Sequence, residues 1–172
     1  MTRFPVRQMT LCAFFTALTA LCAWIGIPLG DTVFTLQTFA LFLTLGLLGG
    51  QWGTRSILCY LLLGAMGAPV FSGFRGGMGA ILGPTGGYLW GFLLTGFTYR
   101  AVEKIGRLPA MILGLLCCYA CGTLWYMTYT GGGWQVVVLQ TVVPYLVPDA
   151  CKIALALHLT RRLKPHLKAY LP

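Results

Sequence analysis

Long apolar runs follow one another along almost the whole chain, and only short polar or glycine-rich turns separate them. Of the 172 residues, 58% are hydrophobic and only 9% are charged. A soluble globular domain carries roughly 25% charged residues to cover its surface. This chain cannot cover itself in water, so we expect lipid around most of it. The pattern excludes a soluble enzyme, a coiled coil and a disordered chain.

A membrane-spanning helix needs about 20 mostly apolar residues, so a chain of this length holds about six of them. We predict an all-α integral membrane protein with one domain over residues 1–172. The first run is too long for the apolar part of a signal peptide, so we expect it to be retained. Pro148 is expected to begin the last helix, after an outer segment over 134–143. The six predicted helices cover residues 8–29, 36–50, 55–68, 86–102, 108–128 and 148–162.

The basic residues predict the orientation, because cytoplasmic ends of spans are enriched in lysine and arginine. With both termini in the cytoplasm, Trp24, Trp90, Trp125 and Trp134 fall near the outer interface, as an aromatic belt would. The net charge of +9 is then explained by topology, and nucleic acid is not expected as a partner. Ten of the twelve basic residues lie on the inside: Arg3, Arg7, Arg55, Arg100, Lys104, Arg107, Arg161, Arg162, Lys164 and Lys168.

Topology leaves four charged residues without a clear role: Asp31, Arg75, Asp149 and Lys152. Asp149 and Lys152 are spaced i, i+3 and share one face of the last predicted helix. If Pro148 begins that helix, Asp149 lies in its first turn, where the helix dipole favours the ionised carboxylate. A charge inside the membrane is expensive and indicates a functional site, although a pair that only joins helices is the alternative. We interpret Asp31 as a solvated loop residue.

A glycine-rich stretch over residues 69–85 separates the third and fourth predicted helices, and its motif runs on as Gly83-Pro84-Thr85-Gly86-Gly87-Tyr88. Glycines allow a backbone to approach a ligand closely, and free amide groups at a helix start can donate hydrogen bonds. The alternative is a segment that serves helix packing and turns. No lysine follows a glycine, so the ATP-binding P-loop motif is absent.

These residues resemble the signature of the BioY family, the biotin-binding substrate (S) components of energy-coupling factor (ECF) transporters. The resemblance rests on the motif from Gly83 to Tyr88, on Arg75-Gly76-Gly77 before it, and on Pro148-Asp149 with Lys152. It covers essentially the whole chain. It implies the six-helix S-component fold in a prokaryotic plasma membrane.

The resemblance also implies a function that the sequence can be compared with. Such proteins bind a vitamin from outside and depend on a transmembrane coupling subunit and two ABC-type ATPases. Ala13 and Ala17 match the Ala-x-x-x-Ala face on which the coupling subunit docks. Biotin would be the ligand, and no metal or cofactor is expected. The implied binding residues are Asp149, Lys152, Arg75, Gly83, Thr85, Gly86, Gly87 and Tyr88, with Phe74 or Trp90 against the apolar ring.

Three other functions remain open at this point. An S component for thiamin, riboflavin or a folate shares the architecture, but those families do not usually carry the glycine motif. The second is an intramembrane enzyme. A serine protease needs a nucleophile motif and an intramembrane histidine, and neither Ser56 nor Ser72 has that setting. A metal-dependent lipid-modifying transferase needs several carboxylates, and the chain has three acidic residues. A small channel or scaffold does not account for Asp149 and Lys152. The sequence does not tell which end of biotin each charged residue contacts, and Arg75 is equally well explained as an interfacial anchor.

Overall fold

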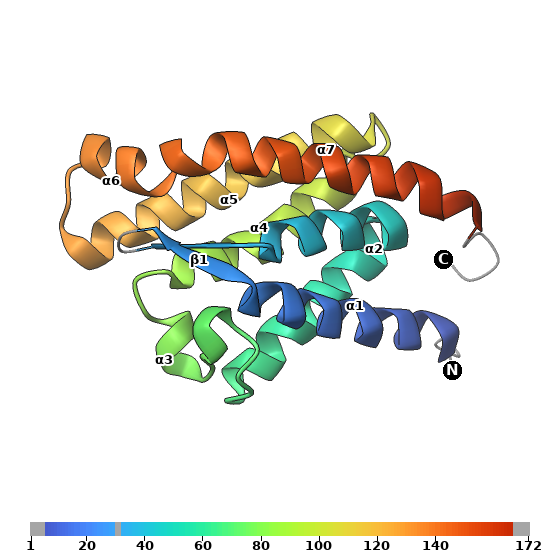
Figure 1. Cartoon of the computed structure of the whole chain (residues 1–172), viewed down its shortest axis with the longest axis horizontal. Helices are drawn as coiled ribbons and strands as arrows, with labels where there is room; N and C mark the ends of the chain where they lie inside the picture. The colour runs from blue at the N-terminus through green and yellow to red at the C-terminus, as the bar shows by residue number, and fades with distance from the viewer. Residues whose placement is uncertain (1–5, 30–31, 167–172) are drawn as a thin grey trace.

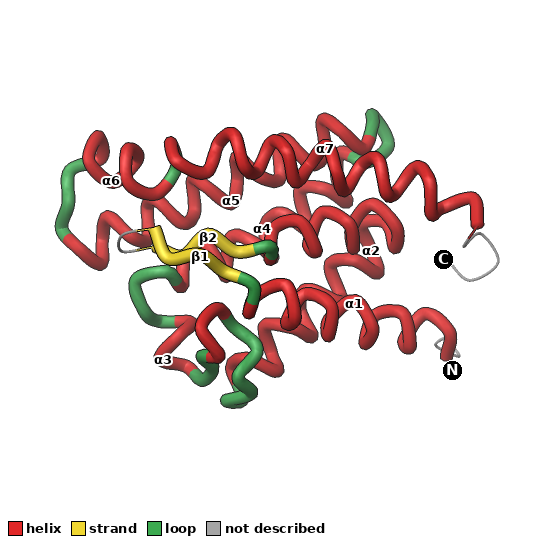
Figure 2. The backbone as a smooth tube through the Cα atoms, viewed as in Figure 1, coloured by secondary structure: helices red, strands yellow, loops and turns green. Residues whose placement is uncertain are grey.

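The computed structural model describes residues 6–29 and 32–166, so Arg3, Asp31 and Lys168 lie outside the described residues. Its helices lie side by side in an elongated bundle, with a two-stranded hairpin at one end (Figures 1 and 2). The elements in chain order are α1 (Val6–Trp24), β1 (Gly26–Leu29), β2 (Thr32–Thr35), α2 (Gln37–Ala65), the 3₁₀ turn η1 (Ser72–Phe74), α3 (Met78–Ile81), α4 (Gly86–Val102), α5 (Arg107–Thr130), α6 (Trp134–Thr141) and α7 (Val143–His166).

Each of the six predicted helices corresponds to a helical segment of the structure, and α4 has the predicted bounds. The predicted helices over 36–50 and 55–68 are the two arms of α2, which is broken at Gly49 with φ 75° and ψ 171°. That φ favours glycine. A Cβ on Gly53 would lie only 3.1 Å from the Leu45 Cα. A straight helix separates residues eight apart by about 12 Å, so the chain reverses at Gly49.

The prediction of a first helix over 8–29 is wrong at its end. The helix α1 stops at Trp24, and residues 26–29 form β1, which pairs antiparallel with β2 from Gly26 opposite Thr35 to Leu29 opposite Thr32. Glycine and β-branched residues weaken a helix, and Pro28 cannot donate the helical hydrogen bond. The run stays apolar throughout, so its composition does not reveal the change of structure.

The prediction that Pro148 begins the last helix is also wrong. The helix α7 begins at Val143, so Pro144 occupies its first turn and Pro148 lies inside it. Proline at the start of a helix is well tolerated, whereas Pro148 removes one internal hydrogen bond. The break in this long apolar run falls at Val142, where α6 and α7 meet at an angle of 41°.

Small residues bring α4 and α5 close together. Gly87 and Gly91 on α4 face Trp125 and Cys118 on α5, and a Cβ on Gly91 would lie 2.9 Å from the Cys118 Sγ. Small residues four apart on a helix let the backbones of two membrane helices approach closely. Part of the glycine motif therefore serves helix packing, which was the alternative interpretation of that segment.

We expect Gly87→Ala to destabilise the fold, because the added Cβ would overlap the Cβ of Trp125. Overpacking of this kind costs about 1–3 kcal/mol, a fall of several degrees in the melting temperature for a chain of this size. Gly79→Ala is the matched control, since nothing lies within 4 Å of a Cβ there. Thermal melts in detergent compare the two variants, and equal melting temperatures would contradict the packing role of Gly87.

The two ends of the bundle differ in character. Trp24, Trp90, Trp125 and Trp134 lie on helices near the end that carries the hairpin, whereas α1 begins and α7 finishes at the opposite end (Figure 1). By length and composition alone, two of the described helices qualify as membrane spans, α1 and α5. The bent pair of α6 and α7 qualifies as a third if it is counted as one span.

Candidate functional site

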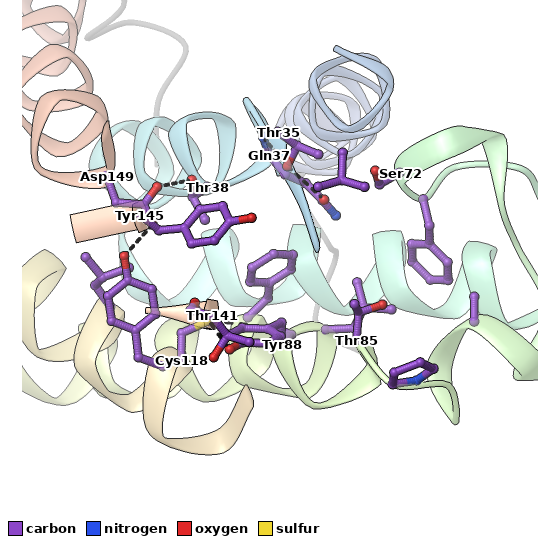
Figure 3. A pocket seen from close by; sticks show the side chains of 18 of the residues that line it. Thr35, Gln37, Thr38, Ser72, Thr85, Tyr88, Cys118, Thr141, Tyr145 and Asp149 are labelled. Carbon is purple, nitrogen blue, oxygen red and sulfur yellow. Dashed lines mark hydrogen bonds between the residues drawn. The ribbon is translucent and has the colours of Figure 1, made fainter. Parts of the chain in front are cut away.

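A cavity of about 190 Å³ lies inside the bundle, near the end that carries the hairpin (Figure 3). Its walls come from β2, from α2, from the segment between α2 and α4, and from α4, α5, α6 and α7. Segments far apart in the sequence thus meet around one space. The lining residues are Val33, Thr35, Gln37, Thr38, Phe71, Ser72, Arg75, Ala80, Pro84, Thr85, Tyr88, Leu89, Phe92, Leu115, Cys118, Tyr119, Thr141, Tyr145, Asp149 and Lys152.

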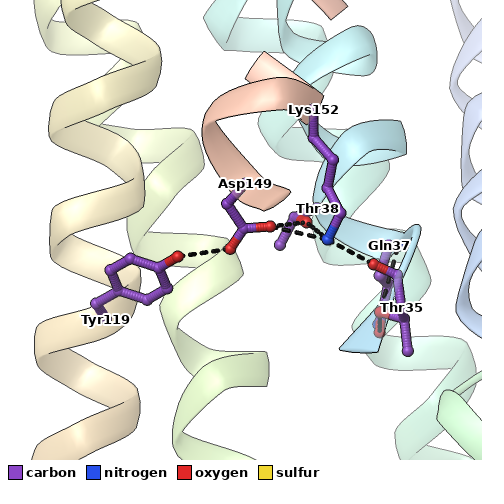
Figure 4. Close-up of polar contacts among 6 residues, drawn as sticks. All are labelled: Thr35, Gln37, Thr38, Tyr119, Asp149 and Lys152. Carbon is purple, nitrogen blue, oxygen red and sulfur yellow. Dashed lines mark hydrogen bonds and ion pairs between the residues drawn. The ribbon is translucent and has the colours of Figure 1, made fainter. Parts of the chain in front are cut away.

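The charged pair predicted from the sequence forms the polar centre of this cavity. The Lys152 Nζ lies 2.8 Å from the Asp149 Oδ1, and the two residues expose only 6% and 3% of their surfaces. The Tyr119 hydroxyl donates a 2.6 Å hydrogen bond to the other carboxylate oxygen, Oδ2 (Figure 4). Thr38 donates a hydrogen bond of 2.9 Å to Oδ1. The carboxylate is therefore held by three donors from three helices.

The ammonium group of Lys152 is satisfied by two further acceptors. It donates to the Thr38 Oγ1 at 2.9 Å and to the Thr35 backbone carbonyl at 2.7 Å (Figure 4). The ring of Phe34, the neighbour of Thr35 in β2, lies 3.9 Å from the Nζ and adds a cation–π contact. The hairpin that the sequence analysis did not predict thus supplies a backbone ligand for the buried lysine.

Burying an ion pair costs several kcal/mol of desolvation per ion, which the Coulomb attraction repays only when the remaining hydrogen bonds are made. Asp149 and Lys152 meet that condition, because three protein acceptors match the three protons of the ammonium group. The placement of Asp149 in the first turn of a helix is wrong, since α7 begins six residues earlier at Val143. Its charge is balanced by Lys152, Thr38 and Tyr119 instead of by the helix end.

The cavity wall also includes Arg75, Thr85 and Tyr88 from the predicted set. Arg75 follows η1 and donates from its Nε to the Ser72 carbonyl at 3.1 Å. Phe71 and Arg75 form an isolated antiparallel bridge, which closes the tight loop between them. Ser72 and Asp149 lie at opposite sides of the cavity in Figure 3, so the guanidinium is near the side away from the buried ion pair.

Gly83, Gly86 and Gly87 do not line the cavity. The Gly83 carbonyl accepts a 2.9 Å hydrogen bond from the Trp125 indole, and a Cβ on Gly86 would overlap the Ile81 carbonyl oxygen. These glycines pack against residues behind the wall and do not contribute to the surface of the cavity.

The two aromatic candidates also lie outside the wall. Phe74 is 63% exposed and stacks on Trp24 at 4.9 Å, and Trp90 is 42% exposed on α4. The aromatic surface of the cavity comes from other residues: Phe71, Tyr88, Phe92, Tyr119 and Tyr145.

Several lining residues were missed by sequence reasoning, above all Thr35, Gln37, Thr38 and Tyr119. Polar residues clustered between two apolar runs were one available signal, since residues 35, 37 and 38 stand at the junction of β2 and α2. A tyrosine in the middle of an apolar span was another, because a buried hydroxyl needs a partner. Which groups these polar side chains bond to depends on the packing of helices that are distant in the sequence, so the sequence alone did not indicate the partners.

A second hydrogen-bond chain fixes the cavity wall beside the hairpin. The Gln37 amide nitrogen donates to the Tyr60 hydroxyl at 2.6 Å, and that hydroxyl donates to the Val70 carbonyl at 3.0 Å. Tyr60 exposes 1% of its surface. The chain links the start of α2 to its second arm and to the segment before η1, so the wall is preorganised.

The predicted docking residues Ala13 and Ala17 lie away from the cavity, on the exposed face of α1. The opposite face of α1 is buried through Cys12, Phe15 and Thr16, and the Thr16 hydroxyl donates to the Ser56 carbonyl at 3.0 Å. Two small residues one turn apart thus leave a shallow surface on the outside of the bundle.

The helices form a bundle with apolar outer faces, and its cavity contains a buried ion pair. These features are typical of a membrane protein that binds a small polar molecule. A model of the BioY family matches residues 1–169. The chain belongs to the BioY family.

Individual known proteins agree over nearly the full length. The "Biotin transporter BioY" of Thermotoga maritima is 38% identical over 164 residues, which cover 92% of this chain and 96% of that protein. The "Biotin transporter BioY2" of Lactococcus lactis subsp. cremoris is 34% identical over 161 residues, or 90% and 88% of the two chains. The crystal structure of an S component for biotin from an ECF-type ABC transporter is 27% identical, with a TM-score of 0.88 over 100% of this chain and 99% of the other.

Proposed function

We propose that the protein binds biotin in the described cavity and serves as the substrate-binding subunit of an ECF transporter. The observation that carries the proposal is the buried Asp149–Lys152 pair, which lies in the wall of the cavity and joins three helices and the hairpin. Family membership favours biotin over thiamin, riboflavin or a folate, and favours a transport subunit over an intramembrane enzyme or a channel.

The chemistry of biotin suits this wall. Its ureido ring offers two N–H donors and one carbonyl acceptor, and its thiophane ring is apolar. The Asp149 carboxylate accepts hydrogen bonds, and charge-assisted bonds to an ionised group are the stronger ones. Leu89, Phe92 and Leu115 give the wall apolar surface for the thiophane ring. We place the ureido ring at the buried ion pair for these reasons.

The valerate carboxylate then reaches the side of the cavity that carries Arg75. Only the Nε of Arg75 has a protein acceptor among the described residues, so its terminal nitrogens are available for a carboxylate. The Ser72 hydroxyl is buried without a hydrogen-bond partner in the described structure. A buried hydroxyl is normally paired, which supports a polar ligand atom beside Ser72.

Arg75→Gln is expected to weaken the binding of biotin by about 10–100-fold, the usual worth of a hydrogen bond to a charged group. Biotin amide has no carboxylate, so its affinity should change by less than about threefold, because the lost interaction is absent from the start. Titration calorimetry with both ligands checks this. Arg100→Gln, an exposed change in the last turn of α4, is the control. Equal losses for the two ligands would contradict the assignment of Arg75 to the carboxylate.

A direct test of the function titrates the purified protein with biotin, thiamin and riboflavin by calorimetry. Submicromolar binding of biotin alone is the expected result. Absence of biotin binding would end the proposal, and tight binding of another vitamin would replace biotin as the ligand.

We also propose the orientation and the partners. Described cations at the end where α7 finishes include Arg7, Arg107 and Arg161, which supports a cytoplasmic position for that end of a multi-pass protein in a prokaryotic plasma membrane. The cavity then faces the outside. The packing of α1 against α2 supports a retained first helix and not a cleaved signal peptide. A transmembrane coupling subunit docks at Ala13 and Ala17, and two ATPases supply the energy.

A further inference from the structure

A second recess lies at the end of the bundle opposite the cavity. Four helices and one turn form it: α2 around its break, the last turn of α4 with the residues after it, the start of α5 and the last turns of α7. These segments meet at the end where α7 finishes (Figure 1). The lining residues are Gly46, Gly49, Tyr99, Glu103, Lys104, Arg107 and Lys164.

The recess has an excess of positive charge. Lys104, Arg107 and Lys164 contribute +3 and Glu103 contributes −1, which leaves a net charge of +2. Glu103 is already engaged, because its Oε2 accepts a 2.8 Å hydrogen bond from the Gly50 backbone N–H. Within residues 6–29 and 32–166 the carboxylates are Glu103 and Asp149. Asp149 pairs with Lys152, and neither carboxylate lies within ion-pair distance of the three cations of the recess.

Exposed apolar residues stand next to the lining cations in the sequence. Ile105 in the turn between α4 and α5 is 82% exposed, Leu108 at the start of α5 is 45% exposed, and Leu163 beside Lys164 is 37% exposed. A site that only binds a free anion does not need such neighbours, whereas lipid brings an anionic phosphate and an apolar chain together. The combination distinguishes this recess from the solvated cations Arg161 and Arg162 on the same helix.

We infer that this recess binds the phosphate of an anionic phospholipid, with Arg107 and Lys164 as its principal ligands and Lys104 at the rim. The lipid would join the end of α7 to the break in α2 and to the α4–α5 turn, because residues of all three segments face the same space. The inference does not depend on the identity of the ligand in the cavity.

The test measures the melting temperature of the purified full-length chain in detergent as phosphatidylglycerol or phosphatidylcholine is added, with inorganic phosphate in a third series. We expect phosphatidylglycerol to raise the melting temperature, and phosphatidylcholine and phosphate to have little effect. The double variant Arg107→Gln/Lys164→Gln should weaken the response to phosphatidylglycerol about tenfold or more in lipid concentration, since a direct hydrogen bond between charged groups is usually worth about tenfold or more.

Arg161→Gln/Arg162→Gln is the matched control, because it removes the same charge from the same end of the bundle outside the recess. It should shift the response by less than about threefold. An equal loss of the phosphatidylglycerol response in both double variants would overturn the inference. It would indicate a general attraction of the lipid to the basic end of the bundle. A phosphate effect as large as that of the lipid would overturn phospholipid as the ligand. A cooperative thermal melt of each variant without lipid verifies that it is folded, and Lys104→Gln provides a milder test if the double variant is not.

Discussion

Asp149→Asn is expected to reduce the affinity for biotin by roughly 100-fold or more. The change leaves the Lys152 ammonium buried at 6% exposure without its counterion, and breaking a buried pair in this way costs about 3–5 kcal/mol. It also weakens the acceptor that we assign to the ureido N–H groups. Titration calorimetry gives the affinity, and a thermal melt without ligand gives the cost to the fold.

Two further variants separate a binding role from a structural one. Asp149→Asn/Lys152→Met removes both buried charges, so it relieves the unpaired ammonium. If the pair only joined helices, this double variant would recover biotin binding along with stability. We expect stability to recover and binding to remain lost. Glu103→Gln is the control for a lost carboxylate, because Glu103 lies in the opposite recess and should leave biotin affinity unchanged.

Tyr119→Phe is the conservative companion. It removes the donor of the 2.6 Å bond to the Asp149 Oδ2 and keeps the ring in the cavity wall. A smaller loss than for Asp149→Asn would follow if Tyr119 positions the carboxylate.

Ala13→Trp is expected to reduce biotin uptake by about tenfold or more while leaving biotin affinity unchanged. Ala13 and Ala17 are exposed one turn apart on α1, and an indole there would fill the shallow surface on which a partner helix approaches closely. Uptake of labelled biotin by cells that also produce the coupling subunit and the ATPases gives the first readout. Copurification of those subunits with the variant gives the second.

Ala154→Trp is the matched control, because Ala154 is also an exposed alanine on a long helix, α7, away from this surface. It should preserve both uptake and copurification. If Ala13→Trp transported biotin like the unchanged protein, the docking surface would have to lie elsewhere on the bundle.

The sequence allowed the helices to be predicted because each apolar run must satisfy its own backbone in lipid, and a helix does so within one segment. It also indicated Asp149 and Lys152, since charges are scarce in this chain and these two stand one turn apart in an apolar run. What it lacked was the tertiary context. The hairpin over 26–35 continues the apolar composition of α1, so only Gly30-Asp31 between two short runs hinted at a turn.

The role of the glycine motif was also ambiguous in the sequence. A dense group of glycines is compatible with a ligand contact and with close packing of helices, and the sequence does not distinguish them. The structure shows packing for Gly86 and Gly87, whereas Thr85 and Tyr88 of the same motif reach the cavity. One short motif therefore combines residues that build the wall with residues that form its surface.

The lysine at the centre of the cavity is bound by a peptide carbonyl of β2, at Thr35, and any amino acid at that position would present the same atom. Alanine scanning of the hairpin will therefore underestimate its importance, because side-chain truncation leaves the carbonyl in place. Deleting or inserting one residue in the hairpin would reveal it, since a shift of register by one residue turns each side chain to the other face and moves the carbonyl away. Related chains should accordingly tolerate substitutions in this segment far better than insertions or deletions.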